Sequence, residues 1–179
     1  MRDLVLVLNF SDTASRTITR KLRSERVMCR IVSGSVSPEE IMEQQPLGLV
    51  LACGTENEIS MQPHPTLFDL PLPMLAIGRA ADTMLQAMGG GEEEAPFLSG
   101  LMETAYSAHP LFDGLENGDR MVKNIHPWLL SASTRSICTC EERTVGFTHK
   151  ERPLMGLQLE MEQSDMDASL MLRNFALSI

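Results

Sequence analysis

A short apolar run that turns into a helix across one glycine constrains this chain more than any other feature. Residues 72–77 (LPMLAI) are long enough for a buried strand. After Gly78, apolar residues recur with the spacing of one helix face until three glycines (89–91) end the pattern. A strand that turns directly into a helix is the arrangement of a nucleophile elbow, where the turn residue lies beside free helix N–H groups. Glycine at this turn offers no nucleophile.

The first half of the sequence alternates apolar runs with helical patterns. The expected elements are, in order, a strand at 4–8, a helix at 12–25, a strand at 27–32, a helix that starts at Ser37 and Pro38, and strands at 47–52 and 72–77. Continuous apolar runs of this kind are typical of strands covered on both faces. The alternation therefore predicts an α/β fold, with a mostly parallel central sheet and helices on both faces.

The second half is less regular. Residues 89–96 (GGGEEEAP) are expected to form an acidic loop with solvated charges, and residues 97–108 fit either a helix or irregular structure. Further strands are expected at 136–140, 144–148 and 154–159, and a last helix after a cap at 163–165. The sequence has no internal repeat and no linker, so we expect one domain over 1–179.

Charge and cysteine content narrow the classes of partner. The chain has 15 Lys and Arg against 24 Asp and Glu, a net charge of −9, which argues against nucleic acid and anionic membranes as partners. No apolar run approaches the ~20 residues of a membrane span. The four cysteines lack framework spacing, which favours reduced thiols and a cytoplasmic location.

An ordered set of segments follows the pattern of a known family over nearly the whole chain. The segments are LVLVLNF, VMCRIV, SPEEI, PLGLVLACG, PLPMLAIG, LQAMGG, HPLFDGL, THKERPLMGLQ and LRNFALSI. Together they resemble the class I (triad) glutamine amidotransferases, above all the amidotransferase domain of GMP synthetase, with the weakest match between 91 and 135. The resemblance implies a flavodoxin-like three-layer α/β sandwich that releases ammonia from glutamine for a synthetase partner.

The functional residues that the resemblance implies are largely replaced. The family's G-I-C-Y-G, with its nucleophilic Cys, corresponds to AIGRA, so the nucleophile position is Gly78. The family's G-V-Q-F-H-P-E corresponds to GLQLEME, so the general base is replaced by Glu160 and only the orienting Glu162 is kept. The oxyanion loop S-G-G-P corresponds to ACGT and keeps one glycine, Gly54. Because cysteine catalysis needs a thiolate and a base, glutaminase activity is not expected.

Arg79 and its neighbours are the remaining candidates for a binding site. Arg79 begins the helix after the elbow, so its guanidinium and the helix N–H groups could hold a small anion in the space left by Gly78. The alternative is that Arg79 pairs with Glu160 or Glu162. Cys53, Gly54 and Glu162 are candidate ligand-binding residues of the same site. Cys53 is either a relocated nucleophile or, as we expect, a buried structural cysteine.

Two other motifs have simpler interpretations. Cys138 and Cys140 place two thiols on one strand face, but no second Cys or His pair completes a zinc site, so we expect no metal and no cofactor. The segment His126-Pro127-Trp128 is interpreted as a core plug, with a ligand platform as the alternative.

These observations favour a catalytically degenerate glutamine amidotransferase-like protein. It would be a binding or regulatory module for a small anionic ligand or for a protein partner, either synthetase-like or regulatory. The alternative is an ammonia-supplying amidotransferase subunit of a GMP-synthetase-like enzyme. We expect loops 53–62, 89–100 and 119–130 to gather into a docking face, where the acidic residues 92–94 favour a basic partner.

Overall fold

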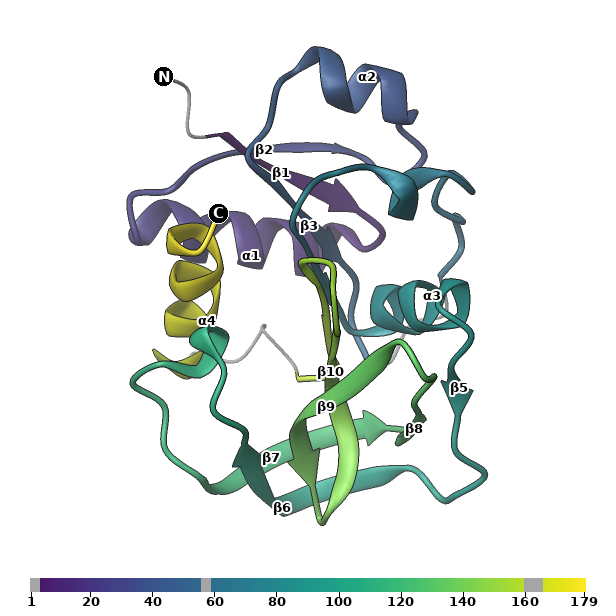
Figure 1. Cartoon of the computed structure of the whole chain (residues 1–179). Helices are drawn as coiled ribbons and strands as arrows, with labels where there is room; N and C mark the ends of the chain where they lie inside the picture. Colours follow the sequence, from purple (N-terminus) through teal and green to yellow (C-terminus); the bar gives the residue numbers. More distant parts are fainter. Residues whose placement is uncertain (1–3, 56–58, 160–165) are drawn as a thin grey trace.

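The computed structural model describes residues 4–55, 59–159 and 166–179, and Figure 1 shows the arrangement of its helices and strands. The elements are, in chain order, β1 (Leu4–Asn9), α1 (Asp12–Ser24), β2 (Met28–Ser33), α2 (Pro38–Glu43), β3 (Gly48–Ala52), the 3₁₀ turn η1 (Leu67–Asp69), β4 (Met74–Ile77), α3 (Arg79–Ala87), β5 (Gly91–Glu92), β6 (Leu98–Tyr106), the 3₁₀ turn η2 (Pro110–Phe112), β7 (Gly118–Ile125), β8 (Trp128–Leu129), β9 (Thr134–Cys140), β10 (Arg143–His149), β11 (Leu154–Leu157) and α4 (Met166–Leu177). The sequence-predicted helices and strands of the first half are all present.

Most of these strands form one mixed sheet in the order β2-β1-β3-β4-β11-β10-β9-β6-β7. Neighbouring strands from β2 to β11 run parallel, whereas those from β11 to β7 pair antiparallel. The antiparallel strands form the lower part of the molecule in Figure 1. The predicted α/β fold with a mostly parallel sheet is therefore confirmed and carries an antiparallel extension.

Helices cover both faces of the parallel part, which makes a three-layer sandwich. Alternate residues of each buried strand face opposite ways, so one strand supplies two cores. Val5, Val50 and Leu75 belong to the core that contains α1 and α4. Leu6 and Leu51 belong to the core under α2 and α3. Burial on both sides explains why these strands appear in the sequence as continuous apolar runs.

The antiparallel region differs from the sequence expectation. Residues 97–108, interpreted as helix or irregular, contain the nine-residue strand β6. Residues 89–96, interpreted as a loop, contain β5, which pairs with β8. Along most of β6 the exposed residues alternate with less exposed ones, and its partners β7 and β9 are distant in sequence. A strand that is only partly buried and whose partners are distant in sequence gives a weak local signal. The predicted cap at 163–165 lies outside the described residues.

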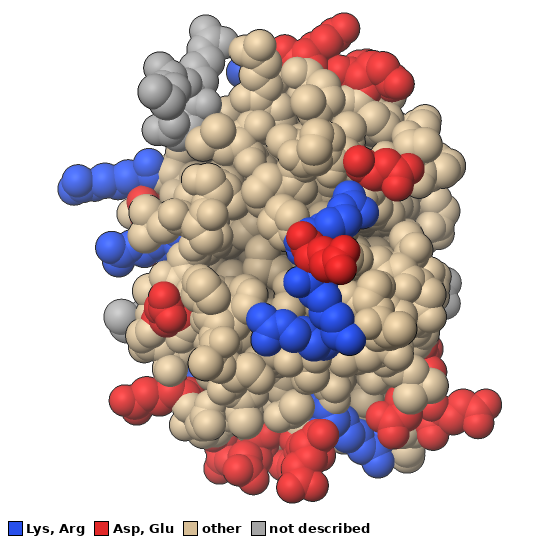
Figure 2. Space-filling model, in the orientation of Figure 1, with Lys and Arg blue, Asp and Glu red and all other residues tan. Residues whose placement is uncertain are grey.

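Charged side chains are unevenly distributed over the face shown in Figure 2, and the cysteines are inside the protein. In Figure 2, acidic side chains lie mainly at the upper and lower ends of one face, and basic ones lie closer to its middle. All four cysteines are buried free thiols, as the lack of framework spacing predicted. Among the described residues, no helix is both long and apolar enough to span a bilayer.

Candidate functional site

Gly78 forms the predicted elbow between β4 and α3. Its backbone has φ +63° and ψ −135°, a conformation that side-chain-bearing residues rarely adopt. The Gly78 N–H donates to the carbonyl oxygen of Leu157 in β11 at 2.8 Å, so the turn is held against the sheet. The strand–turn–helix geometry inferred from residues 72–91 is present in the structure.

The loop after β3 fills the space above this elbow. A β-carbon built on Gly78 would lie 2.3 Å from the carbonyl oxygen of Cys53 and 2.6 Å from that of Gly54, closer than real β-carbons come to other atoms. In an enzyme elbow, the N–H after the nucleophile is a donor of the oxyanion hole. Here that group, the N–H of Arg79, donates to the Gly54 carbonyl at 3.1 Å. The chain's own backbone therefore closes the elbow.

Cys53 is 1% exposed, in the core beneath α2 and α3. Burial raises the pKa of its thiol, so the thiol stays protonated around neutral pH. A buried, protonated thiol lacks the exposure and the low pKa of a catalytic cysteine. This placement matches the interpretation of Cys53 as a structural residue.

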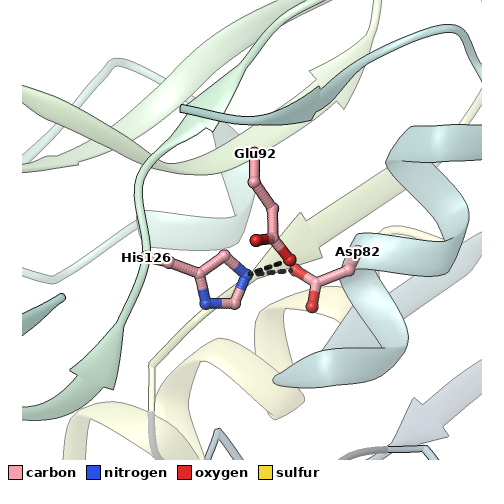
Figure 3. A group of neighbouring side chains, drawn as sticks. All are labelled: Asp82, Glu92 and His126. Carbon is pink, nitrogen blue, oxygen red and sulfur yellow. Dashed lines mark hydrogen bonds and ion pairs between the residues drawn. The ribbon is translucent and has the colours of Figure 1, made fainter. Parts of the chain in front are cut away.

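Four charged or titratable side chains meet one helical turn beyond the elbow. They are Arg79 and Asp82 from α3, Glu92 from β5 and His126 from the segment before β8. Figure 3 shows that Asp82, Glu92 and His126 point toward one another. His126 Nε2 lies 3.0 Å from Asp82 Oδ1 and 3.4 Å from Glu92 Oε1. We call these four residues the α3 cluster.

Arg79 binds all three of the other members. Its Nε donates to Asp82 Oδ2 at 3.1 Å, and its Nη2 lies 3.5 Å from Glu92 Oε1. Its Nη1 is 2.7 Å from both ring nitrogens of His126. A neutral imidazole accepts at one nitrogen only, and we assign Nε2–H as donor to Asp82 and Nδ1 as acceptor from Arg79. The predicted partners Glu160 and Glu162 lie outside the described residues.

The buried members of the cluster are held by further polar contacts. Asp82, only 7% exposed, also accepts a hydrogen bond from Trp128 Nε1 at 2.8 Å. The side-chain amide of Gln158 accepts from the His126 backbone N–H at 3.1 Å and donates to the His126 carbonyl. Trp128 packs edge-on against Phe147, with ring centroids 5.1 Å apart. Trp128 is thus a buried core side chain, as predicted, and its indole N–H also orients the carboxylate of Asp82.

A polar cavity of about 250 Å³ lies beside the cluster. Its lining residues are Ile59, Gln62, Arg79, Asp82, Thr83, Gln86 and Glu92. The described parts of segments 53–62, 89–100 and 119–130 meet around this point, as predicted, although 119–130 consists largely of β7 and β8 and is not a loop. Thr55 Oγ1 donates to the carbonyl of Lys123, and Gly91 pairs with Leu129. The cavity offers a guanidinium, two carboxylates and side-chain amides to a ligand.

The structure corrects the expectation for Glu92, and it adds Asp82 and His126 to the candidate site. Glu92 was expected to be solvated with its acidic neighbours, but it pairs with Arg79 because β5 brings it beside α3. Asp82 was not identified as a site residue, and His126 was considered only as part of a core segment, with a ligand platform as the alternative. The i, i+3 spacing of Arg79 and Asp82 places both on one helix face, and this spacing could have indicated that they pair. No sequence signal linked His126 to α3. Cys138 and Cys140 are both buried core residues.

The comparisons with known proteins agree with the resemblance found in the sequence. No protein-family model matches the chain. The glutamine-hydrolysing GMP synthase of Hahella chejuensis is 29% identical over 98% of this chain, which spans 37% of that relative's length. A GMP synthase subunit protein from Thermoplasma acidophilum has a TM-score of 0.79 at 19% identity, covering 98% of this chain and 93% of that one.

A glutamine amidotransferase from Thermotoga maritima shares the fold with a TM-score of 0.67 at 15% identity, covering 90% of this chain and 77% of that one. These similarities confirm the flavodoxin-like sandwich that the ordered motifs implied. Over its whole length, the chain is similar to the glutamine amidotransferase domain of GMP synthases.

Proposed function

We propose that this chain is a glutamine amidotransferase-like binding module that does not hydrolyse glutamine. The observation that carries the proposal is the closed elbow. The Gly54 carbonyl takes the N–H of Arg79, and the two carbonyls of Cys53 and Gly54 occupy the position of a side chain at Gly78. Backbone oxygens point at the place where an enzyme presents its nucleophile and its oxyanion donor.

The residue types at the elbow support the same proposal. Thiol catalysis needs a nucleophile that is activated by a base. Gly78 has no side chain, and the sequence has Glu160 where the family's base would stand. Cys53 is buried with a raised pKa, so it does not replace the missing thiolate.

The ligand site that we propose is the face where the three loops meet, for a protein partner. A small anion is not favoured at the α3 cluster, because the Arg79 guanidinium is already paired with the carboxylates of Asp82 and Glu92. Near that face, apolar side chains are exposed: Phe97 by 63%, Leu101 by 64%, Met121 by 57% and Leu129 by 57%. Leu101 and Met121 lie directly opposite each other on β6 and β7, and neighbouring exposed apolar side chains are typical of interaction surfaces. Because the chain is similar over nearly its whole length to proteins named GMP synthase, a synthetase-like protein is the partner we propose.

Ammonia release with millimolar glutamine tests the loss of catalysis. The purified chain should stay at the level of the buffer blank, while an active glutaminase in the same assay gives signal. The Gly78→Cys variant with Glu160→His should remain inactive, because the Cys53 and Gly54 carbonyls leave no room for the new side chain. Turnover that is abolished by Cys53→Ala would overturn the proposal and identify a relocated nucleophile.

A second candidate function is an ammonia-supplying subunit of a GMP-synthetase-like enzyme. The similarity to glutamine-hydrolysing GMP synthases over 98% of this chain favours it. Such activity would require a partner to open the elbow by breaking the hydrogen bond from the Arg79 N–H to Gly54. Glutamine-dependent ammonia release that appears only after addition of the host's synthetase would establish this function. The same addition without any release, but with complex formation on gel filtration, supports a binding module.

The acidic residues of loop 89–100 have a separate test. With Glu92 paired to Arg79, Glu93 and Glu94 remain for a basic partner. Glu93→Lys with Glu94→Lys should slow association with the synthetase at low salt, whereas Glu142→Lys, on the exposed β9–β10 turn, serves as the matched control. Equal association rates for both variants would remove the acidic loop from the docking face.

A further inference from the structure

We propose that Asp82, Glu92 and His126 form a binding site for one divalent transition metal ion of the zinc class, which replaces the Arg79 guanidinium. Each of the three residues offers one ligand atom, and these atoms all lie within 4.8 Å of one another. They come from α3, β5 and the segment before β8, so they converge on one point from three directions (Figure 3).

The spacing of the ligand atoms fits a metal ion. Tetrahedral ligands held about 2.0–2.2 Å from zinc lie roughly 3.3–3.6 Å from one another. His126 Nε2 is 3.4 Å from Glu92 Oε1 and 3.0 Å from Asp82 Oδ1. An ion between these atoms requires displacement of Arg79 and a shift of the carboxylates, whose ligand atoms lie within 4.8 Å of one another. Glu92, whose side chain is 43% exposed, can adjust.

The donor set indicates which class of ion is bound. One imidazole nitrogen with two carboxylate oxygens suits zinc and its neighbours better than magnesium or calcium, which prefer oxygen ligands alone. Asp82 and Glu92 also line the cavity, so a fourth position would be open to water. Trp128 Nε1 orients the Asp82 carboxylate, and Gln158 fixes the His126 backbone. Such outer contacts are typical of metal sites.

Charge balance and position make Arg79 the competitor of the metal. With a neutral imidazole, one guanidinium leaves one net negative charge on the cluster, whereas a divalent ion neutralises both carboxylates. Arg79 Nη1 lies 2.7 Å from His126 Nε2, the atom that would bind the metal, so the guanidinium and the ion cannot both be held there. Arg79, which is 24% exposed and lines the cavity, then moves aside into that space.

Metal uptake by the whole chain tests this site. Chelator-treated protein is titrated with Zn²⁺ by calorimetry, and with Co²⁺ by the visible absorption that tetrahedral N/O coordination gives. We expect one ion per chain at micromolar concentration and no displacement by millimolar Mg²⁺. Glu92→Gln should weaken Zn²⁺ binding at least tenfold, and Trp128→Phe roughly tenfold, since it removes only the outer contact. Arg79→Met should tighten binding, because the competing cation is gone.

His64→Gln is the matched control, because His64 lies outside the cluster and contacts Thr66. It should leave the affinity unchanged, and circular dichroism verifies that each variant is folded. His126 is buried, so Glu92→Gln and Arg79→Met carry the test if His126→Gln fails to fold. The proposal is overturned by an absence of Zn²⁺ uptake, by equal affinity in the wild-type chain and Glu92→Gln, or by weaker binding in Arg79→Met.

Discussion

The elbow at Gly78 and the α3 cluster adjoin each other, since Arg79 directly follows Gly78, but they are built in opposite ways. The elbow is made of backbone: a glycine, the helix N–H groups and the carbonyls of Cys53 and Gly54. The cluster is made of side chains from three separate segments of the chain. Backbone geometry persists without a nucleophile, because glycine tolerates the elbow conformation at little steric cost. A side-chain cluster persists only while each member has its partners.

The two regions therefore respond differently to substitution. At the elbow, any added atom meets backbone that does not yield. In the cluster, the cost of a change depends on how deeply the side chain is buried. Asp82 is inside and triply hydrogen-bonded, whereas Glu92 is at the rim.

The largest effect is expected for Gly78→Ala. The new methyl group would overlap the Cys53 carbonyl oxygen at 2.3 Å, and alanine would have to adopt φ +63°. Together these should lower the free energy of unfolding by about 3–5 kcal/mol. Urea denaturation measures the change. Gly118→Ala is the control, because nothing lies within 4 Å of a β-carbon there, and its change should be small. Equal stability of the two variants would mean that the loop over the elbow yields easily.

Asp82→Ala should have the next largest effect. It leaves the Trp128 N–H and the His126 ring without their acceptor, and it removes the buried partner of Arg79. We expect a loss of about 3 kcal/mol in the free energy of unfolding. Thermal and urea melts measure this, with the exposed Asp69→Ala as the comparison. A loss no greater than that of Asp69→Ala would show that the cluster adds nothing to the fold.

Thiol labelling measures how tightly the elbow is closed. Burial raises the pKa of Cys53, and also that of Cys29, Cys138 and Cys140, so all four thiols stay protonated and covered in the native state. Iodoacetamide should modify native Cys53 at least about tenfold more slowly than the urea-unfolded chain at pH 8.

The pH dependence of this labelling has a definite sign. Because the native thiols hold their protons above the ordinary thiol pKa, the labelling rate should rise only as the pH increases beyond that ordinary value. Mass spectrometry of tryptic peptides assigns the modified cysteine. Rapid modification of Cys53 alone at neutral pH would show that the loop over the elbow opens readily.

The smallest effect is expected for Glu92→Gln. Its carboxylate is 43% exposed and 3.5 Å from Arg79 Nη2, so solvent and salt screen the pair. The free energy of unfolding should fall by less than about 1 kcal/mol, and the difference should shrink further in high salt. A loss as large as that of Asp82→Ala would place the rim of the cluster in the same cooperative unit as its interior.

The sequence by itself determined the parallel half of the fold and the elbow. Strands such as β3 and β4 are buried on both faces, so their apolar character is continuous and local, and Gly78 marks the turn within a few residues. The absence of a nucleophile follows from the glycine at position 78, which has no side chain. The resemblance carried by short motifs was confirmed by relatives that match the whole length of the chain.

Only the tertiary structure decided what surrounds the elbow. The Gly54 carbonyl reaches the Arg79 N–H because β3 and β4 are neighbours in the sheet, which no local pattern specifies. Glu92 and His126 meet α3 because β5 pairs with β8, a contact between short segments with weak propensity. Local spacing encodes strands and helices, but contacts between polar residues distant in sequence depend on how the packed elements place them.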